Sequence, residues 1–174
     1  MKINLKMLGV TATMATGIML TGGVSAFAAD GGEYKSNAII EFKPSTEITP
    51  PVDPIDPEIP VGPVDPTDPE GPNPGTNGPL SIDYASSLDF GVQKITSTDQ
   101  VYKAAAQKFT DRGDGPNYVQ VTDNRGTETG WSLQVKQDGQ FKSDSGKELT
   151  GAEITFKNGV VNTVSASPKP SVVK

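Results

Sequence analysis

The sequence contains no cysteine and no histidine in 174 residues. Without cysteine there are no disulfides, thiolate nucleophiles or cysteine-ligated metal sites. Without histidine there is no serine-histidine triad, and the most common metal ligand is missing. Because no catalytic motif accompanies the remaining carboxylates, lysines, serines and tyrosines, we expect a protein that is not an enzyme and has no cofactor and no resident metal.

Aromatic side chains are also scarce, at 6% of the residues with a single tryptophan, and no stretch carries a long helical pattern. Glycine and proline are abundant instead, with 19 and 15 copies. This composition favours short strands joined by many turns. The sequence therefore predicts an all-β protein.

The net charge of -6 is unevenly distributed. Lys35 and Lys43 are the only basic side chains in the acidic segment 30–79, whereas residues 80–174 carry acidic and basic side chains in equal number. A neutral main region gives no electrostatic surface for nucleic acid or anionic lipid. We therefore expect no nucleic-acid partner.

Residues 1–28 have the pattern of a secretory signal peptide. Lys2 and Lys6 form the positively charged N-terminal region, and an uncharged apolar run then extends to Val24. Small residues at Ala26 and Ala28 suit a cleavage site after Ala28. Threonines and glycines dilute the run, so an uncleaved anchor is the less favoured alternative. The sequence predicts secretion, with no membrane insertion after cleavage.

The mature chain divides by composition into three segments, 34–49, 50–79 and 80–174. In the first, the alternation of NAIIEF at 37–42 predicts a strand that is too short to fold alone. We expect it to dock on the edge of the sheet formed by the third segment.

The second segment, 50–79, has proline at every third position from Pro51 to Pro72, with aspartates before several prolines. Polyproline II has three residues per turn, so this spacing predicts an extended, solvated and acidic rod. The rod would act as a spacer or as a ligand for a partner. The alternative is a solvated loop inserted between two strands of one domain.

The third segment is centred on Tyr118–Lys136, where two apolar-alternating runs flank the turn 123–126. We expect a hairpin that buries Trp131, Leu133 and Val135 on one face. Further runs predict core strands at 80–90 and 101–109, and a hairpin at 149–164 around Asn158-Gly159, although 101–109 is also compatible with a helix. Together they predict an antiparallel β-sandwich.

Three stretches resemble one family in their order along the chain. GPLSIDYASSLDFG lies upstream, VQVTDNRGTETGWSL is central, and ELTGAEITF follows. They resemble the WxL family, surface proteins of low-GC Gram-positive bacteria. The resemblance implies a β domain over 29–174, Ig-like in architecture, that attaches non-covalently to the cell wall outside the cell.

One feature of that family is absent. A second W-x-L motif preceded by a tyrosine is typical of its C-terminal part, and nothing after Trp131 supplies it. The chain therefore resembles a truncated copy, with an Ig-like sandwich that is incomplete at the C-terminus.

The resemblance implies peptidoglycan, or another cell-wall glycan, as the partner. The alternative is an adhesion or assembly module that binds another surface protein or a host matrix protein. The candidate ligand-binding residues are Tyr84, Tyr118, Arg125, Trp131 and Leu133, and Tyr102 is a further exposed candidate.

The candidates differ in role. Trp131 suits stacking on a sugar ring, but its alternation with Leu133 favours a place in the core. The tyrosines are better candidates for an exposed platform. Arg125 pairs either with wall carboxylates or, as we expect, locally with Asp123.

The loop carboxylates Asp111, Asp114 and Asp123 suggest calcium by their chemistry, but their spacing does not match an EF-hand loop. We therefore expect these side chains to cap turns.

Overall fold

The computed structural model describes residues 19–27, 33–169 and 171. Its four strands form two separate antiparallel pairs. Strand β1 (Met19–Phe27) pairs with β2 (Glu33–Glu41), and β3 (Leu80–Ala85) pairs with β4 (Val119–Asp123). The described residues contain no helix, so none is long and apolar enough to cross a membrane. The expected antiparallel all-β class is confirmed, while the Ig-like sandwich stays a prediction.

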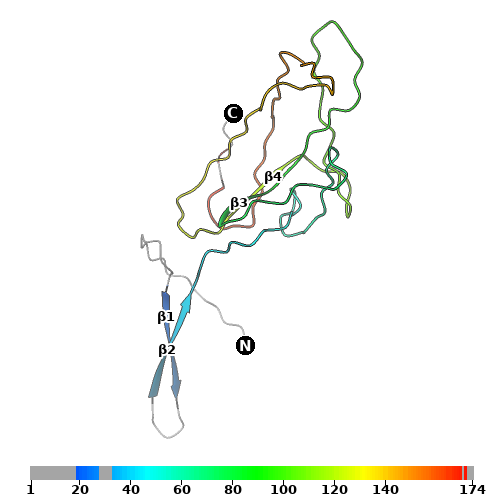
Figure 1. Cartoon of the computed structure of the whole chain (residues 1–174). Helices are drawn as coiled ribbons and strands as arrows, with labels where there is room; N and C mark the ends of the chain where they lie inside the picture. The colour runs from blue at the N-terminus through cyan, green and yellow to red at the C-terminus, as the bar shows by residue number, and fades with distance from the viewer. Residues whose placement is uncertain (1–18, 28–32, 170, 172–174) are drawn as a thin grey trace.

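The β1–β2 hairpin projects away from the rest of the protein (Figure 1). Strand β2 contains most of the predicted strand 37–42, but the expected docking on the main sheet is wrong, because β2 pairs along its whole length with β1. The two strands are close in the chain, so little entropy is lost when they pair. Strand β1 lies inside the predicted signal peptide, whose cleavage stays a prediction.

The buried and exposed faces of the β3–β4 sheet are the reverse of those expected from the sequence. Leu80 and Ile82, predicted to be core residues, are 37% and 42% exposed, whereas Ser81 and Asp83 between them are 3% and 2% exposed. The pairing shifts register between Ile82 and Tyr84, which brings Tyr84 into the buried set as well. The sheet therefore turns its polar face inward.

A hydrogen-bond network explains why the polar face is buried. The Asp83 carboxylate accepts from Ser81 Oγ at 2.6 Å, from Thr122 Oγ1 at 2.5 Å and from Gln120 Nε2 at 3.1 Å. A buried carboxylate is tolerated when donors satisfy it. Gln120 and Thr122 of β4 therefore lie on the face that holds Asp83.

The proline-rich segment is not the extended rod that its spacing predicts. It turns back on itself, with Asp53 N donating to Ile59 O at 2.8 Å and Val61 N to Pro51 O at 3.1 Å. Asp53 and Val61 are only 7% and 8% exposed. The segment also reaches residues far along the chain, since Val64 N donates to Lys108 O at 2.8 Å.

The aspartates before the prolines cause these turns. Each carboxylate accepts a hydrogen bond from the backbone N–H two residues later, at distances between 2.7 and 3.3 Å; the pairs are Asp53 with Ile55, Asp56 with Glu58, Asp65 with Thr67 and Asp68 with Glu70. Such Asx-turns bend the chain at every acceptor. The aspartates that made the predicted rod acidic therefore fold the segment into a series of turns.

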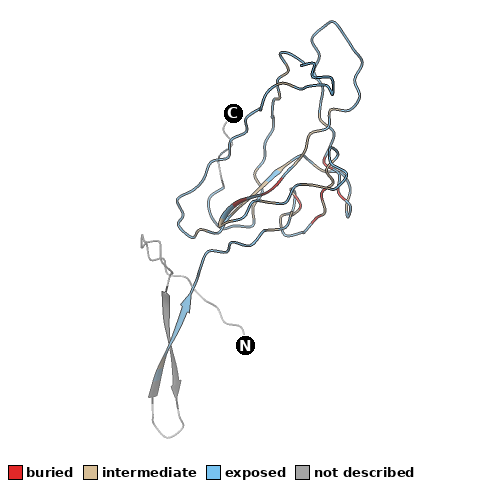
Figure 2. Cartoon of the chain, viewed as in Figure 1, coloured by how far each residue is buried: buried red, intermediate tan, exposed pale blue. Residues whose placement is uncertain are grey.

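A small aromatic cluster lies where the proline-rich segment meets the sheet. The ring centroids of Tyr84 and Tyr118 are 4.8 Å apart, and those of Phe109 and Tyr118 are 6.2 Å apart. Arg112 lies 5.1 Å above the Phe109 ring and forms an ion pair with Asp53. Figure 2 shows that the buried positions gather in this part of the molecule, around β3 and the adjoining loops.

The predicted hairpin over 118–136 is only half correct. Strand β4 confirms its first run, but β4 pairs with β3, and residues 131–136 form no strand. Positive φ angles at Gly126, Glu128 and Gly130 redirect the chain between the two runs.

Two other predicted strand regions are also wrong. Residues 101–109 form neither a helix nor a continuous strand, and make isolated bridges from Gln107 to Gly115 and from Phe109 to Pro63. Residues 149–164 contain no strand, although Asn158 has the positive φ of 58° that its turn signal suggests. The turn at Asn158 is therefore correct, but the runs on either side of it do not form a hairpin.

Candidate functional site: an apolar recess beside Trp131

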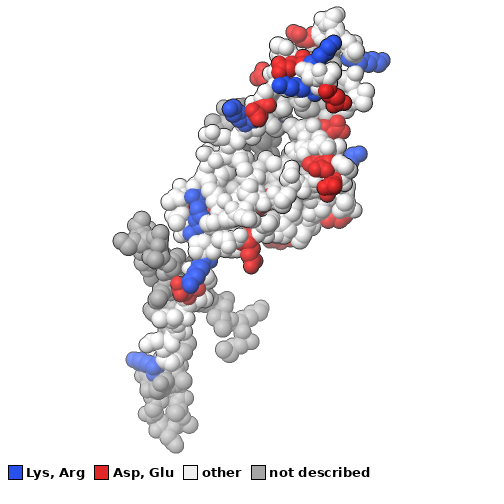
Figure 3. All heavy atoms as spheres, in the orientation of Figure 1, with Lys and Arg blue, Asp and Glu red and all other residues white. Residues whose placement is uncertain are grey.

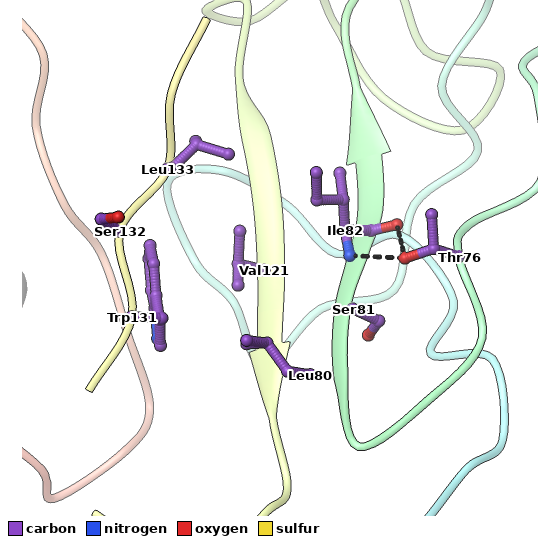
Figure 4. A pocket seen from close by; sticks show the side chains of 8 residues that line it. All are labelled: Thr76, Leu80, Ser81, Ile82, Val121, Trp131, Ser132 and Leu133. Carbon is purple, nitrogen blue, oxygen red and sulfur yellow. Dashed lines mark hydrogen bonds between the residues drawn. The ribbon is translucent and has the colours of Figure 1, made fainter. Parts of the chain in front are cut away.

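The exposed face of the β3–β4 sheet and the W-x-L segment enclose a shallow recess of about 270 Å³. Leu80 and Ile82 of β3 and Val121 of β4 form its floor, and Trp131 and Leu133 form one wall (Figure 4). Its full lining is Thr76, Leu80, Ser81, Ile82, Val121, Trp131, Ser132 and Leu133. The lining contains no charged side chain.

Trp131 is neither buried nor fully solvated. It is 37% exposed, and its indole lies beside Val121 with Leu133 farther along the same segment (Figure 4). The core position favoured from the sequence is therefore wrong for Trp131, for Leu133 at 40% exposed and for Val135 at 67% exposed. The physical reason is that the first run pairs with β3, so the second run lies beside the sheet without a partner strand to cover it.

Polar groups line the recess on the side of β3. Thr76 Oγ1 accepts from Ile82 N at 2.9 Å and donates to Ile82 O at 3.4 Å (Figure 4). Thr76 N also donates to Ile82 O at 2.9 Å. Thr76 and Ser132 were not singled out from the sequence. Thr76 lies in the turn-rich PNPGTNG stretch, where no pattern distinguishes one polar residue from the next.

Arg125 is bound to the loop that precedes Trp131. Its Nε and Nη2 donate to the two carboxylate oxygens of Asp123 at 2.9 and 2.8 Å, and Nη2 also donates to Gly130 O at 2.6 Å. The expected local pairing with Asp123 is confirmed. The hydrogen bond from Arg125 lowers the pKa of Asp123 and in turn raises the pKa of Arg125.

Tyr84 and Tyr118 lie apart from the recess, in the aromatic cluster. Tyr84 is 4% exposed, so the expected exposed platform is wrong for this residue. Burial raises the pKa of both tyrosines. The register shift after Ile82 turns Tyr84 inward, and nothing in the alternation of LSIDYA signals that shift.

Tyr102 is 40% exposed, as expected of a platform residue. It lines a second, more open depression of about 410 Å³, formed with Val92, Gln93, Lys94, Thr96 and Gln100. This depression lies in a loop without strands and carries one lysine.

Two of the three loop carboxylates considered for calcium have partners within the protein. Asp123 caps its own turn as expected, accepting from Arg125 N at 3.1 Å, whereas Asp111 bonds to a residue far along the chain. Asp111 Oδ2 accepts from Gly62 N at 3.0 Å, and Asp123 is bound to Arg125. The described residues bring no three acidic side chains together as a metal site.

Charged side chains are unevenly distributed over the face shown in Figure 3. They gather at the upper end of the molecule, and the broad middle of this face is largely uncharged. The uncharged lining of the recess is in keeping with this pattern.

Comparison with protein families places the chain in a known family. Residues 29–174 match the family described as WxL domain, surface cell wall-binding. No curated protein and no solved structure matches the chain. The match begins at the residue after the predicted cleavage position and covers the recess, the aromatic cluster and the proline-rich segment. The chain belongs to the WxL family of cell wall-binding surface domains.

Proposed function

We propose that this domain is secreted and attaches non-covalently to peptidoglycan, with the recess beside Trp131 as the contact for the glycan. Membership of a cell wall-binding family supports attachment to the wall. The observation that carries the choice of site is the half-exposed indole of Trp131 against an uncharged, apolar floor.

The chemistry of this recess suits a sugar chain. A pyranose ring presents an apolar face of C–H groups, which stacks on an aromatic ring, and its hydroxyl and acetamido groups hydrogen-bond at the edge. Trp131 and Val121 offer the apolar surface, and Ser132 lies at its border. Binding by a recess without charge depends little on salt, in contrast to binding of anionic polymers.

Sedimentation with purified peptidoglycan, before and after removal of teichoic acid, tests this proposal. The proposal predicts that the protein sediments equally with both preparations. Protein that remains in the supernatant, or that sediments only when teichoic acid is present, contradicts it. Capture of a protein partner from a surface extract without any binding to glycan would support the adhesion alternative instead.

Variants locate the contact. Trp131→Ala and Leu133→Ser remove the wall of the recess, and loss of such an anchor weakens binding by roughly tenfold or more. Val160→Ser is the matched control, because Val160 is 80% exposed and lies outside the recess. Wild-type affinity in Trp131→Ala would show that the glycan binds elsewhere.

A further inference from the structure

Arg125 bonds to both ends of the loop 124–129, which connects β4 to the segment that carries Trp131. Asp123, at the end of β4, is the Cα partner of Leu80 on β3, so it belongs to the sheet that forms the recess floor. Gly130 directly precedes Trp131, which forms the wall. One guanidinium bonds to both, at 2.8 and 2.9 Å to the Asp123 carboxylate and at 2.6 Å to the Gly130 carbonyl.

The loop between Asp123 and Gly130 has an unusual backbone conformation that other contacts must hold in place. Gly126, Glu128 and Gly130 have φ angles of 67°, 51° and 69°. A non-glycine residue such as Glu128 persists in this region only where its surroundings hold it there. Within the loop the side chains of Thr127 and Thr129 bond to each other at 3.0 Å, whereas Arg125 bonds the end of the loop to the sheet.

The same geometry argues against Arg125 as a ligand contact. Its Nε and Nη2 are both engaged within the protein, and Arg125 is not among the residues that line the recess. A guanidinium that binds a wall carboxylate bidentately needs two donors on one side to be free. The stem-peptide carboxylates are therefore a poor match for this arginine.

We infer that Arg125 is a positioning residue for the recess: by tying the Gly130 carbonyl to the Asp123 carboxylate, it fixes Trp131 against Val121. The inference rests on the proposed function for its effect on wall binding. Its effect on the indole itself does not, because the position of Trp131 is measurable without any wall.

The test compares Arg125→Gln and Arg125→Lys with wild type in iodide quenching of the single tryptophan, in thermal unfolding and in peptidoglycan sedimentation. Arg125→Gln is expected to increase the quenching constant of Trp131 and to weaken sedimentation by about tenfold, with a cooperative unfolding transition retained. Arg125→Lys keeps the charge but not the fork of donors, so an intermediate result is expected. Lys157→Gln removes an equal charge from an exposed position and is expected to change none of the three measurements.

The outcomes separate the two proposals. Increased quenching in Arg125→Gln, with wall binding unchanged in both this variant and Trp131→Ala, supports the positioning role and contradicts the proposed recess. Wild-type quenching in Arg125→Gln, with wall binding lost in Trp131→Ala, overturns the positioning role and leaves the recess supported. If Arg125→Gln and Lys157→Gln weaken binding equally without a change in quenching, the arginine acts by charge alone and the inference is wrong.

Discussion

The side-chain amide of Gln120 on β4 donates to the carboxylate of Asp83 on β3 at 3.1 Å. The same amide accepts from Val52 N at 2.8 Å and donates to Pro50 O at 3.1 Å. It therefore bonds to the backbone of 50–52 as a neighbouring strand would, and it ties the proline-rich segment to the polar face of the sheet. This contact holds the start of the proline-rich segment against the sheet.

Gln120→Glu tests this tie. The substitution replaces a donor by a second carboxylate beside Asp83 and leaves Pro50 O without its donor. We expect a loss of about 1 to 3 kcal/mol in the free energy of unfolding, measured by urea denaturation. Gln100→Glu makes the same chemical change at an exposed position and is expected to stay within about 0.5 kcal/mol of wild type. Equal stability of the two variants would show that the segment is not held by Gln120.

A pair of tyrosine substitutions tests the aromatic cluster. The hydroxyl of Tyr84 donates to Gln107 Oε1 at 2.7 Å, and Gln107 is 2% exposed. Tyr84→Phe therefore leaves this buried acceptor without a donor. The hydroxyl of Tyr118 is buried with no partner in the described part of the chain. We expect Tyr84→Phe to cost about 1 to 3 kcal/mol and Tyr118→Phe to cost less than about 0.5 kcal/mol. Thermal unfolding with the reverse order of stability would contradict the network.

Gly75 approaches the backbone of β3 closely. A Cβ at this position would lie 2.8 Å from the carbonyl oxygen and 3.0 Å from the Cα of Asp83, and backbone atoms do not yield easily. Gly75→Ala is therefore expected to destabilise the protein by about 1 to 3 kcal/mol through overpacking. Gly113→Ala is the control, because an added Cβ meets nothing within 4 Å. A Gly75→Ala variant as stable as this control would mean that the proline-rich segment does not pack on β3.

The sequence predicted which segments form strands and turns more accurately than it predicted which segments pair with each other. The alternation in VQVTD correctly indicated a strand, and the DNRG stretch correctly indicated a turn with Arg125 paired to Asp123. Both features depend on residues a few positions apart. The pairing of β4 with β3, across more than thirty residues, has no local signal. Local pattern alone therefore favours a hairpin between β4 and the run Trp131–Lys136.

Two of the errors arise because the pattern rules treat polar side chains as solvated. Asp83, Gln120 and Thr122 satisfy each other inside the protein, which reverses the faces that Leu80 and Ile82 were expected to occupy. The prolines and aspartates of 50–72 likewise form a chain of Asx-turns. The apolar residues of the recess were therefore identified from the sequence, but as core residues, whereas Thr76 and Ser132 were not identified.

The ion pair of Asp123 predicts a pH dependence of stability. The hydrogen bond from Arg125 holds the pKa of Asp123 below its usual value of 3.8, so the unfolded state takes up a proton at higher pH than the folded state does. The contribution of Asp123 is present above the usual pKa and is lost as the pH falls through the lowered one. We expect Asp123→Asn to be less stable than wild type at about pH 7 and closer to it at about pH 2. A stability difference that stays constant across this range would show that the pair contributes nothing.

The single tryptophan allows the central claim, that the glycan contacts Trp131, to be measured directly. Fluorescence titration with soluble peptidoglycan fragments is predicted to shift the Trp131 emission to shorter wavelength and to reduce iodide quenching, both saturating with the fragment concentration, because the stacked sugar displaces water from the indole. Unchanged emission and quenching under conditions in which the protein sediments with peptidoglycan would place the wall-binding site elsewhere and contradict the account.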